Sequence, residues 1–155
     1  MTNTSCIANQ CDYVWSVFDG CLYFNGTALA RLLEREWARA FEPFELSPPQ
    51  GFMLRIVNDR PGLLQRELAE ALTIARPTAT RLLDGLERKS LIRRATAEVD
   101  RRECLIYPTP AAREIGPALN AASGRVTKRL KQLLGAEAFD DVVSQVRRVT
   151  ASLKD

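Results

Sequence analysis

The sequence predicts a mainly α-helical protein with a small β-wing of two or three strands. Three observations lead to this prediction. Two neighbouring segments in the middle of the chain carry leucine and alanine at helical spacing. Two short strand-like runs joined by a polar loop follow them directly. Long amphipathic segments lie on both sides, and a hydrophobic content of 46% in 155 residues is enough for a buried core.

The two central segments predict a pair of short helices. In the first, Leu64, Leu68 and Leu72 lie one helical turn apart. The second begins at Pro77, a residue that is tolerated in the first turn of a helix. Its apolar positions follow the spacing i, i+3, i+4, i+7, at Ala79, Leu82, Leu83 and Leu86. Because only residues 73–76 connect them, the helices must cross steeply, which is the geometry of a helix-turn-helix.

The strand-like runs cover residues 91–94 and 104–107. The loop between them is polar and holds two consecutive arginines, Arg101 and Arg102. A helix-turn-helix followed by a hairpin with a basic tip is a winged helix. Its second helix can enter a DNA major groove of about 12 Å width, while the tip reaches phosphates or the neighbouring minor groove.

Long helices are predicted on both sides of this module. One runs from Cys21 to the break at Pro43, and the next starts at Ser47, where Gln50 can complete a capping box. Two more follow the wing, over residues 110–134 and from residue 136 onward. They carry more apolar surface than a small winged helix can bury alone, so we expect a homodimer.

The predicted organisation is one compact chain with three parts. Residues 1–46 form an amino-terminal segment and a dimerisation helix. Residues 47–109 form the winged helix-turn-helix, and residues 110–155 form the carboxy-terminal dimerisation helices.

Charge and composition limit the function classes. The net charge is only +3, but residues 60–113 hold 11 basic against 7 acidic side chains, as a nucleic-acid-binding module would. Histidine is absent, which removes the commonest general base and metal ligand, so we expect no enzyme, cofactor or metal. Neither a signal peptide nor a run of about 20 apolar residues is present, so we expect a cytoplasmic protein with no membrane partner.

Two sequence motifs carry a family resemblance. Asp100, Arg101 and Arg102 resemble the Asp-x-Arg wing signature of the MarR-type regulators. A TPAAR segment, which begins at Thr109, follows this signature at the expected distance. The similarity covers roughly residues 21–153. Members of this family are winged-helix dimers of bacteria and archaea, most often repressors that a small ligand or thiol oxidation releases from DNA. The resemblance implies a sequence-specific regulator that binds a palindromic operator in double-stranded DNA.

The resemblance also implies a set of DNA-binding residues. Arg102 would enter the minor groove, and Asp100 would orient a wing arginine by a salt bridge. The exposed face of the second helix would read base edges or bind phosphate. The candidates are Arg76, Thr78, Thr80, Arg81, Asp100, Arg101 and Arg102.

Some features of this region depart from the family pattern or stay open. The position after the second helix is usually glycine in the family, but here it is Ser90. Pro108 replaces the usual leucine after the second wing strand, so we expect that strand to end early. Arg76 could equally bind a neighbouring carboxylate. Arg93 and Arg94 alternate along a strand, so one could contact phosphate while the other packs on the core.

Cysteine supports a rival function. Cys21 lies at the start of the first long helix, where the organic-peroxide sensors of the family keep a reactive thiol. Those sensors supply tyrosines from the next helix, and residues 47–51 contain none, so a structural thiol is favoured. Cys6 and Cys11 have no zinc-module spacing with Cys21, and Cys104 is expected in the core.

The family usually binds aromatic acids between the dimerisation helices and the DNA-binding module. Candidates for lining such an effector pocket are Trp15, Phe24, Trp37, Phe52 and Met53, although a core role explains each equally well. A third reading is a winged helix used for protein contact, because a fold does not fix a function.

Overall fold

The computed structural model describes residues 18–96 and 103–154. The chain divides into two compact units, Met1–Glu36 and Trp37–Asp155. In the first unit, helix α2 (Leu22–Phe41) begins after a turn that Asn25 stabilises. Its side-chain Nδ2 donates to the carbonyl oxygens of Phe18, Asp19 and Cys21 at 3.1, 3.0 and 2.9 Å.

The second unit starts within the last turn of α2 and continues through a short 3-10 helix, η1 (Glu42–Phe44), into α3 (Pro48–Asp59). The predicted capping box of α3 is confirmed. Ser47 Oγ accepts from the backbone N–H of Gln50 at 3.5 Å, and Gln50 Oε1 accepts from the N–H of Ser47 at 3.2 Å. This cap fixes where α3 begins.

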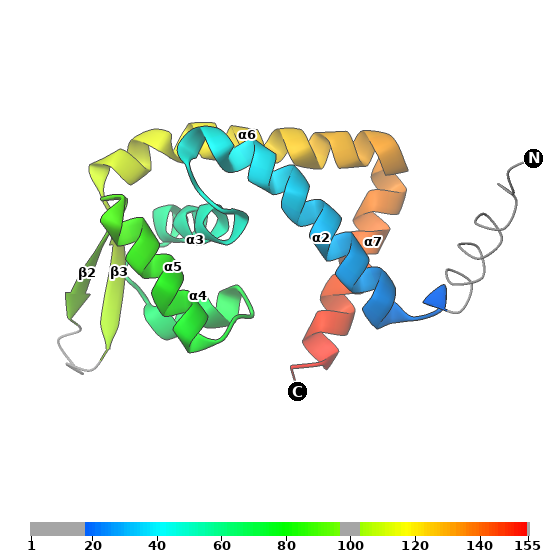
Figure 1. Ribbon diagram of the computed structural model, residues 1–155, viewed down its shortest axis with the longest axis horizontal. Coiled ribbons are helices and arrows are strands. Elements are labelled where there is room, and N and C mark those ends of the chain that lie inside the picture. Colours follow the sequence, from blue (N-terminus) through cyan, green and yellow to red (C-terminus); the bar gives the residue numbers. More distant parts are fainter. Residues whose placement is uncertain (1–17, 97–102, 155) are drawn as a thin grey trace, which may run out of the picture. The chain divides into compact units, whose positions relative to one another are not determined.

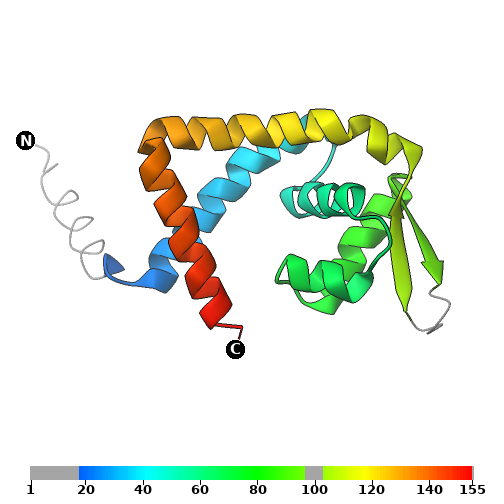
Figure 2. The ribbon, with the colours of Figure 1, turned by 180° about the vertical axis from the view of Figure 1, so that it is seen from behind.

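The predicted helix-turn-helix is formed by α4 (Gln65–Ala71) and α5 (Arg76–Arg88). α3 lies between this pair and the long helix α6 (Pro110–Leu134) in both views (Figure 1, Figure 2). α5 approaches α3 closely at Gly85, where an added Cβ would collide with the side-chain amide of Gln50. The largest fully buried side chains come from these helices, from the end of α2 and from the sheet: Phe41, Met53, Leu54, Val57, Leu68, Leu83, Leu86, Ile106 and Leu119.

Three antiparallel strands form the sheet, in the order β1-β3-β2. They are β1 (Leu63–Leu64), β2 (Ile92–Thr96) and β3 (Cys104–Pro108). Leu64 therefore lies in a strand and not in the helix predicted for it, because it pairs with Leu105. The expected early end of the second wing strand is also wrong. β3 includes Pro108, which pairs with Ile92 at the strand end, where a missing N–H is tolerated.

Helix α5 ends on Ser90, the residue that replaces the family's glycine. Ser90 has φ 57°, in the left-handed region. Its N–H donates to the carbonyl of Glu87 at 2.8 Å, and the N–H of Leu91 donates to Leu86 at 3.0 Å. This is a Schellman motif, closed here by serine. Thr73 has φ 54° and ends α4 in the same way, which makes the turn of the helix-turn-helix.

Two helices complete the second unit. Thr109 caps α6, since its Oγ1 accepts from the N–H of Ala112 at 3.3 Å. Gly135 separates α6 from α7 (Ala136–Ser152), which has no buried residue. The valines of α7 are exposed instead, with Val142 at 46% and Val146 at 54%. Across residues 18–96 and 103–154, no helix is both long and apolar enough to span a membrane.

Candidate nucleic-acid interface

The outer face of α5 presents three of the predicted DNA-binding side chains. Arg76, Thr78 and Arg81 are exposed, whereas Ala79 and Leu83 on the opposite face are fully buried. Among the described residues, the guanidinium groups of Arg76 and Arg81 form no ion pair. Both side chains are exposed, as contact with a ligand outside the chain requires.

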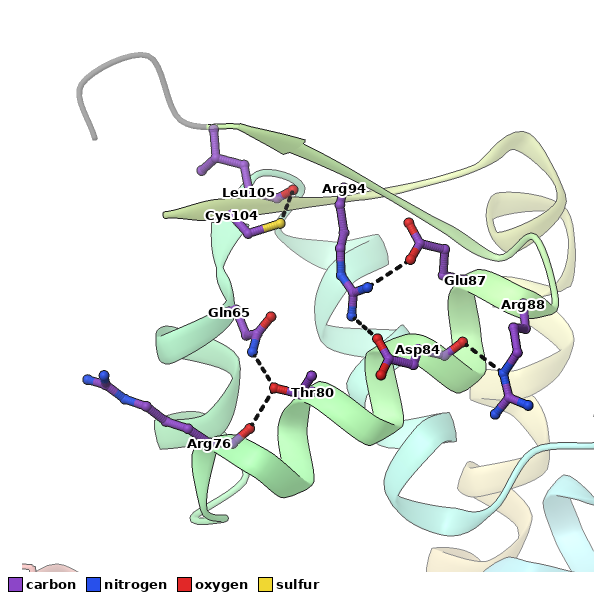
Figure 3. A network of polar contacts seen from close by, with 9 residues as sticks. All are labelled: Gln65, Arg76, Thr80, Asp84, Glu87, Arg88, Arg94, Cys104 and Leu105. Carbon is purple, nitrogen blue, oxygen red and sulfur yellow. Dashed lines mark hydrogen bonds and ion pairs between the residues drawn. The ribbon is translucent and has the colours of Figure 1, made fainter. Parts of the chain in front are cut away.

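Thr80 differs from its neighbours because its hydroxyl has two partners within the protein (Figure 3). It donates to the carbonyl of Arg76 at 3.0 Å and accepts from Gln65 Nε2 at 2.7 Å. Thr80 thus joins the two helices of the helix-turn-helix. The sequence analysis did not predict a role for Gln65. The sequence shows only that a polar residue occupies the first turn of α4.

The open choice between the two strand arginines is decided by their contacts. Arg94 turns toward α5, where its Nη2 lies 2.6 Å from Asp84 Oδ1 and its Nη1 lies 2.8 Å from Glu87 Oε2 (Figure 3). Arg93 is exposed, and its guanidinium lies 4.6 Å from the ring centre of Tyr107. Of the two, Arg93 is the one that faces solvent.

A further ion pair joins α4 to the wing. Arg66 Nη1 lies 3.0 Å from Glu103 Oε1, and the two residues line a cavity of about 280 Å³ together with Leu64, Gln65, Arg76 and Cys104. Cys104 is half-buried at the edge of the core, not within it as predicted.

The predicted wing residues Asp100, Arg101 and Arg102 lie outside the described residues.

Cys21 acts as the amino-terminal cap of α2. Its Sγ accepts a 3.5 Å hydrogen bond from the backbone N–H of Phe24, and the thiol is free and half-buried. The described residues contain no group of three side chains that could hold a metal ion. Cys6 and Cys11 lie outside them.

Of the candidates for an effector pocket, three lie in the second unit. Met53 is fully buried in the core and leaves no surface for a ligand. Trp37 and Phe52 are half-buried with ring centres 5.9 Å apart. Phe24 belongs to the first unit and stacks on Phe18 at 5.1 Å, and Trp15 is outside the described residues.

Arg55, a half-buried cation beside the ring of Phe52, was not among the residues predicted from the sequence. Its Nε donates to Asn120 Oδ1 at 2.6 Å and its Nη1 to Ser123 Oγ at 2.9 Å. The guanidinium lies 5.3 Å from the ring centre of Phe52, and burial lowers the pKa of Arg55 below its usual value. No carboxylate among the described residues pairs with it.

Arg55 lines an open surface pocket of about 560 Å³ together with residues of α6 and the first residue of α7. Its other lining residues are Asn120, Ser123, Gly124, Thr127, Lys128, Lys131, Gln132 and Ala136. Trp37, Phe52 and Met53 do not line it. Asn120, Ser123 and Thr127 recur at helical spacing, a polar stripe along α6 that could have indicated this wall from the sequence.

A helix-turn-helix with a basic outer face, followed by a β-wing, defines a winged-helix DNA-binding protein. Residues 46–104 match the model of the MarR family. The HTH-type transcriptional regulator MgrA of Staphylococcus aureus is 31% identical over 115 residues, which cover 66% of this chain and 78% of MgrA. The chain belongs to the MarR family and is a transcriptional regulator of the MarR type that binds DNA.

Solved structures show the same fold. The transcriptional repressor CouR, bound to a 23-mer DNA duplex, matches with a TM-score of 0.77 and 26% identity, over 88% of this chain and 96% of CouR. The MepR–DNA complex of S. aureus matches with a TM-score of 0.75 and 23% identity, over 84% of this chain and 96% of MepR.

Proposed function

We propose that this protein is a dimeric repressor that binds a palindromic operator and is released from it by a small organic acid. The observation that carries the DNA-binding part is the exposed face of α5, where Arg76, Thr78 and Arg81 project with no partner among the described residues. The name of CouR, a repressor bound to a DNA duplex, supports the direction of regulation.

In this proposal each α5 enters a major groove, with half-sites about 34 Å apart. Arg81 and Thr78 discriminate between bases, while Arg76 and Arg93 bind phosphate and make affinity fall with salt. Arg101 and Arg102 extend the contact from the wing, with Arg102 in the minor groove and Asp100 orienting one of them. Thr80 contributes indirectly, by holding α5 against α4 through Gln65.

A homodimer is supported by the apolar surface of α7. Val142, Val143 and Val146 are exposed to 46%, 40% and 54%, and they recur at helical spacing along one face. Such a continuous apolar face is unfavourable in water. Burial against a second copy would remove it and would pair two α5 helices across a two-fold axis.

The pocket beside Arg55 supports an anionic effector. Among the described residues, the guanidinium of Arg55 donates to the neutral side chains of Asn120 and Ser123, so its charge can pair with a carboxylate of a ligand. Lys128, also on the wall, is exposed and adds positive charge. The proposed ligand is therefore an organic acid, aromatic in the family's usual case, bound within the second unit.

One experiment tests the regulator and its wing together. Purified protein selects from a pool of random-sequence duplexes, and the winning site is then titrated with salt, using wild type and Arg102→Ala. A palindromic winner with a steep salt dependence that Arg102→Ala weakens supports the proposal. Absence of enrichment, or a winner indifferent to Arg102, favours a winged helix used for protein contact.

A further inference from the structure

Arg94 links the two DNA-binding elements of this protein. It lies on β2 at the base of the wing, and both of its carboxylate partners lie on α5, one helical turn apart. Its side chain is 25% exposed, and its Nε is buried with no hydrogen-bond partner among the described residues. An arginine that leaves one donor unsatisfied is held there by its other contacts, which are the bonds to Asp84 and Glu87.

Asp84 continues the outer face of α5, because it follows Thr80 by four residues and Arg81 by three. Carboxylates on that face repel DNA phosphates, so by charge alone both Asp84 and Glu87 weaken binding. The planar guanidinium of Arg94 engages each carboxylate through a different nitrogen, which a lysine ammonium cannot reproduce in this fork geometry.

We propose that Arg94 is a positioning residue for DNA binding. Held by Asp84 and Glu87, it fixes the base of the wing to the carboxy-terminal half of α5, so that helix and wing reach the duplex in one geometry. Arg94 itself does not contact phosphate. The inference rests on the proposed function, in which α5 and the wing both contact DNA.

The test compares operator affinity and its salt dependence for Arg94→Gln and for Asp84→Asn/Glu87→Gln. Each variant should lose affinity about tenfold, within the range of coupling in a salt-bridge network. The loss in the double variant is decisive, since removal of two negative charges beside DNA should strengthen binding on electrostatic grounds alone. Both variants should keep the wild-type salt slope, and combining them should add no further loss.

Arg93→Gln is the matched control, because Arg93 has the same charge and adjoins Arg94 but faces solvent over Tyr107. As a phosphate contact it should reduce the salt slope by about one unit. Arg94→Lys should recover only part of the lost affinity. Affinities are measured well below each variant's melting temperature, so that a residue needed only for stability would leave them unchanged.

Two results would overturn the inference. One is wild-type affinity in Arg94→Gln. The other is tighter binding by Asp84→Asn/Glu87→Gln together with a reduced salt slope in Arg94→Gln, which would make Arg94 a phosphate contact. Failure of wild type to bind any operator counts against the proposed function instead. Hydrogen exchange of residues 84–96 then decides, since faster exchange in Arg94→Gln than in Arg93→Gln supports the link and equal exchange refutes it.

Discussion

Gln65 Nε2 donates a 2.7 Å hydrogen bond to Thr80 Oγ1, and this bond joins the first turn of α4 to the first half of α5. The same hydroxyl donates to the carbonyl of Arg76. The angle between the two helices of a helix-turn-helix decides how the second one enters a groove. This pair therefore acts on DNA binding through geometry.

Removal of either partner should cost stability and DNA affinity together. Gln65→Leu and Thr80→Val should each lower the free energy of unfolding by about 1 kcal/mol, the usual net value of such a bond. The double variant should lose less than the sum, because the two substitutions remove one interaction. Urea unfolding measures this, and Thr78→Val on the exposed face is the control, expected within about 0.5 kcal/mol of wild type. Full additivity would show that the two residues are not coupled.

Ser90→Gly should stabilise the protein. Serine at φ 57° carries a steric cost that glycine does not, although glycine also raises the entropy of the unfolded chain. The expected net gain is about 0.5 kcal/mol in the free energy of unfolding, measured by urea denaturation. The hydroxyl of Thr109 donates to the backbone carbonyl of Ser90, and this hydrogen bond is retained in the variant. A loss of stability would mean that the serine side chain contributes more than its strain costs.

Arg81→Ala and Arg102→Ala should weaken DNA binding in different ways. Arg81 is exposed on the outer face of α5 and is proposed to read a base edge, so its loss should cost about 1–3 kcal/mol and relax base preference at one position of each half-site. Arg102→Ala should weaken binding to all sequences similarly and reduce the salt slope by about one unit. Selection from a random pool separates the two effects. An unchanged base preference in Arg81→Ala would remove this residue from sequence reading.

Arg55→Gln should abolish the effector response and leave operator binding intact. Although burial lowers the pKa of Arg55, a guanidinium stays protonated at neutral pH, so a carboxylate finds a full positive charge there. Benzoate and salicylate, titrated against the protein–operator complex, should release wild type but not the variant. Arg113→Gln, which removes an exposed cation of α6 that does not line this pocket, is the charge-matched control. Release of Arg55→Gln at wild-type concentrations would place the effector elsewhere.

Peroxide should not release the wild-type protein from DNA. Cys21 Sγ accepts the Phe24 N–H as a helix cap, and residues 47–51 supply no tyrosine to bind a thiolate. Cys21→Ser should retain operator affinity, since serine also caps helices. The thiol-sensor reading predicts the opposite pattern, in which peroxide releases wild type and not the variant. A mobility shift assay with and without cumene hydroperoxide distinguishes them.

Much of the fold could be predicted because its signals are local. The spacing of Ala79, Leu82, Leu83 and Leu86 fixes the buried face of α5, and the Ser47 cap fixes the start of α3. Leu64 was misplaced because its strand conformation depends on a partner, Leu105, 41 positions away in the sequence. The prediction that β3 would end before Pro108 was wrong for a similar reason. Proline lacks a backbone N–H, but it is tolerated at the end of a strand, where Pro108 pairs with Ile92.

By itself the sequence determined the helix-turn-helix, the wing and the outer face of α5, because amphipathic spacing and capping act within a few residues. Tertiary structure alone decided which polar side chains form hydrogen bonds or ion pairs within the protein. Thr80 meets Gln65, Arg94 meets Asp84 and Glu87, and Arg55 meets Asn120 and Ser123. These contacts join segments that pack together only in the folded chain, so no short-range pattern distinguishes a free arginine from one already held by the protein.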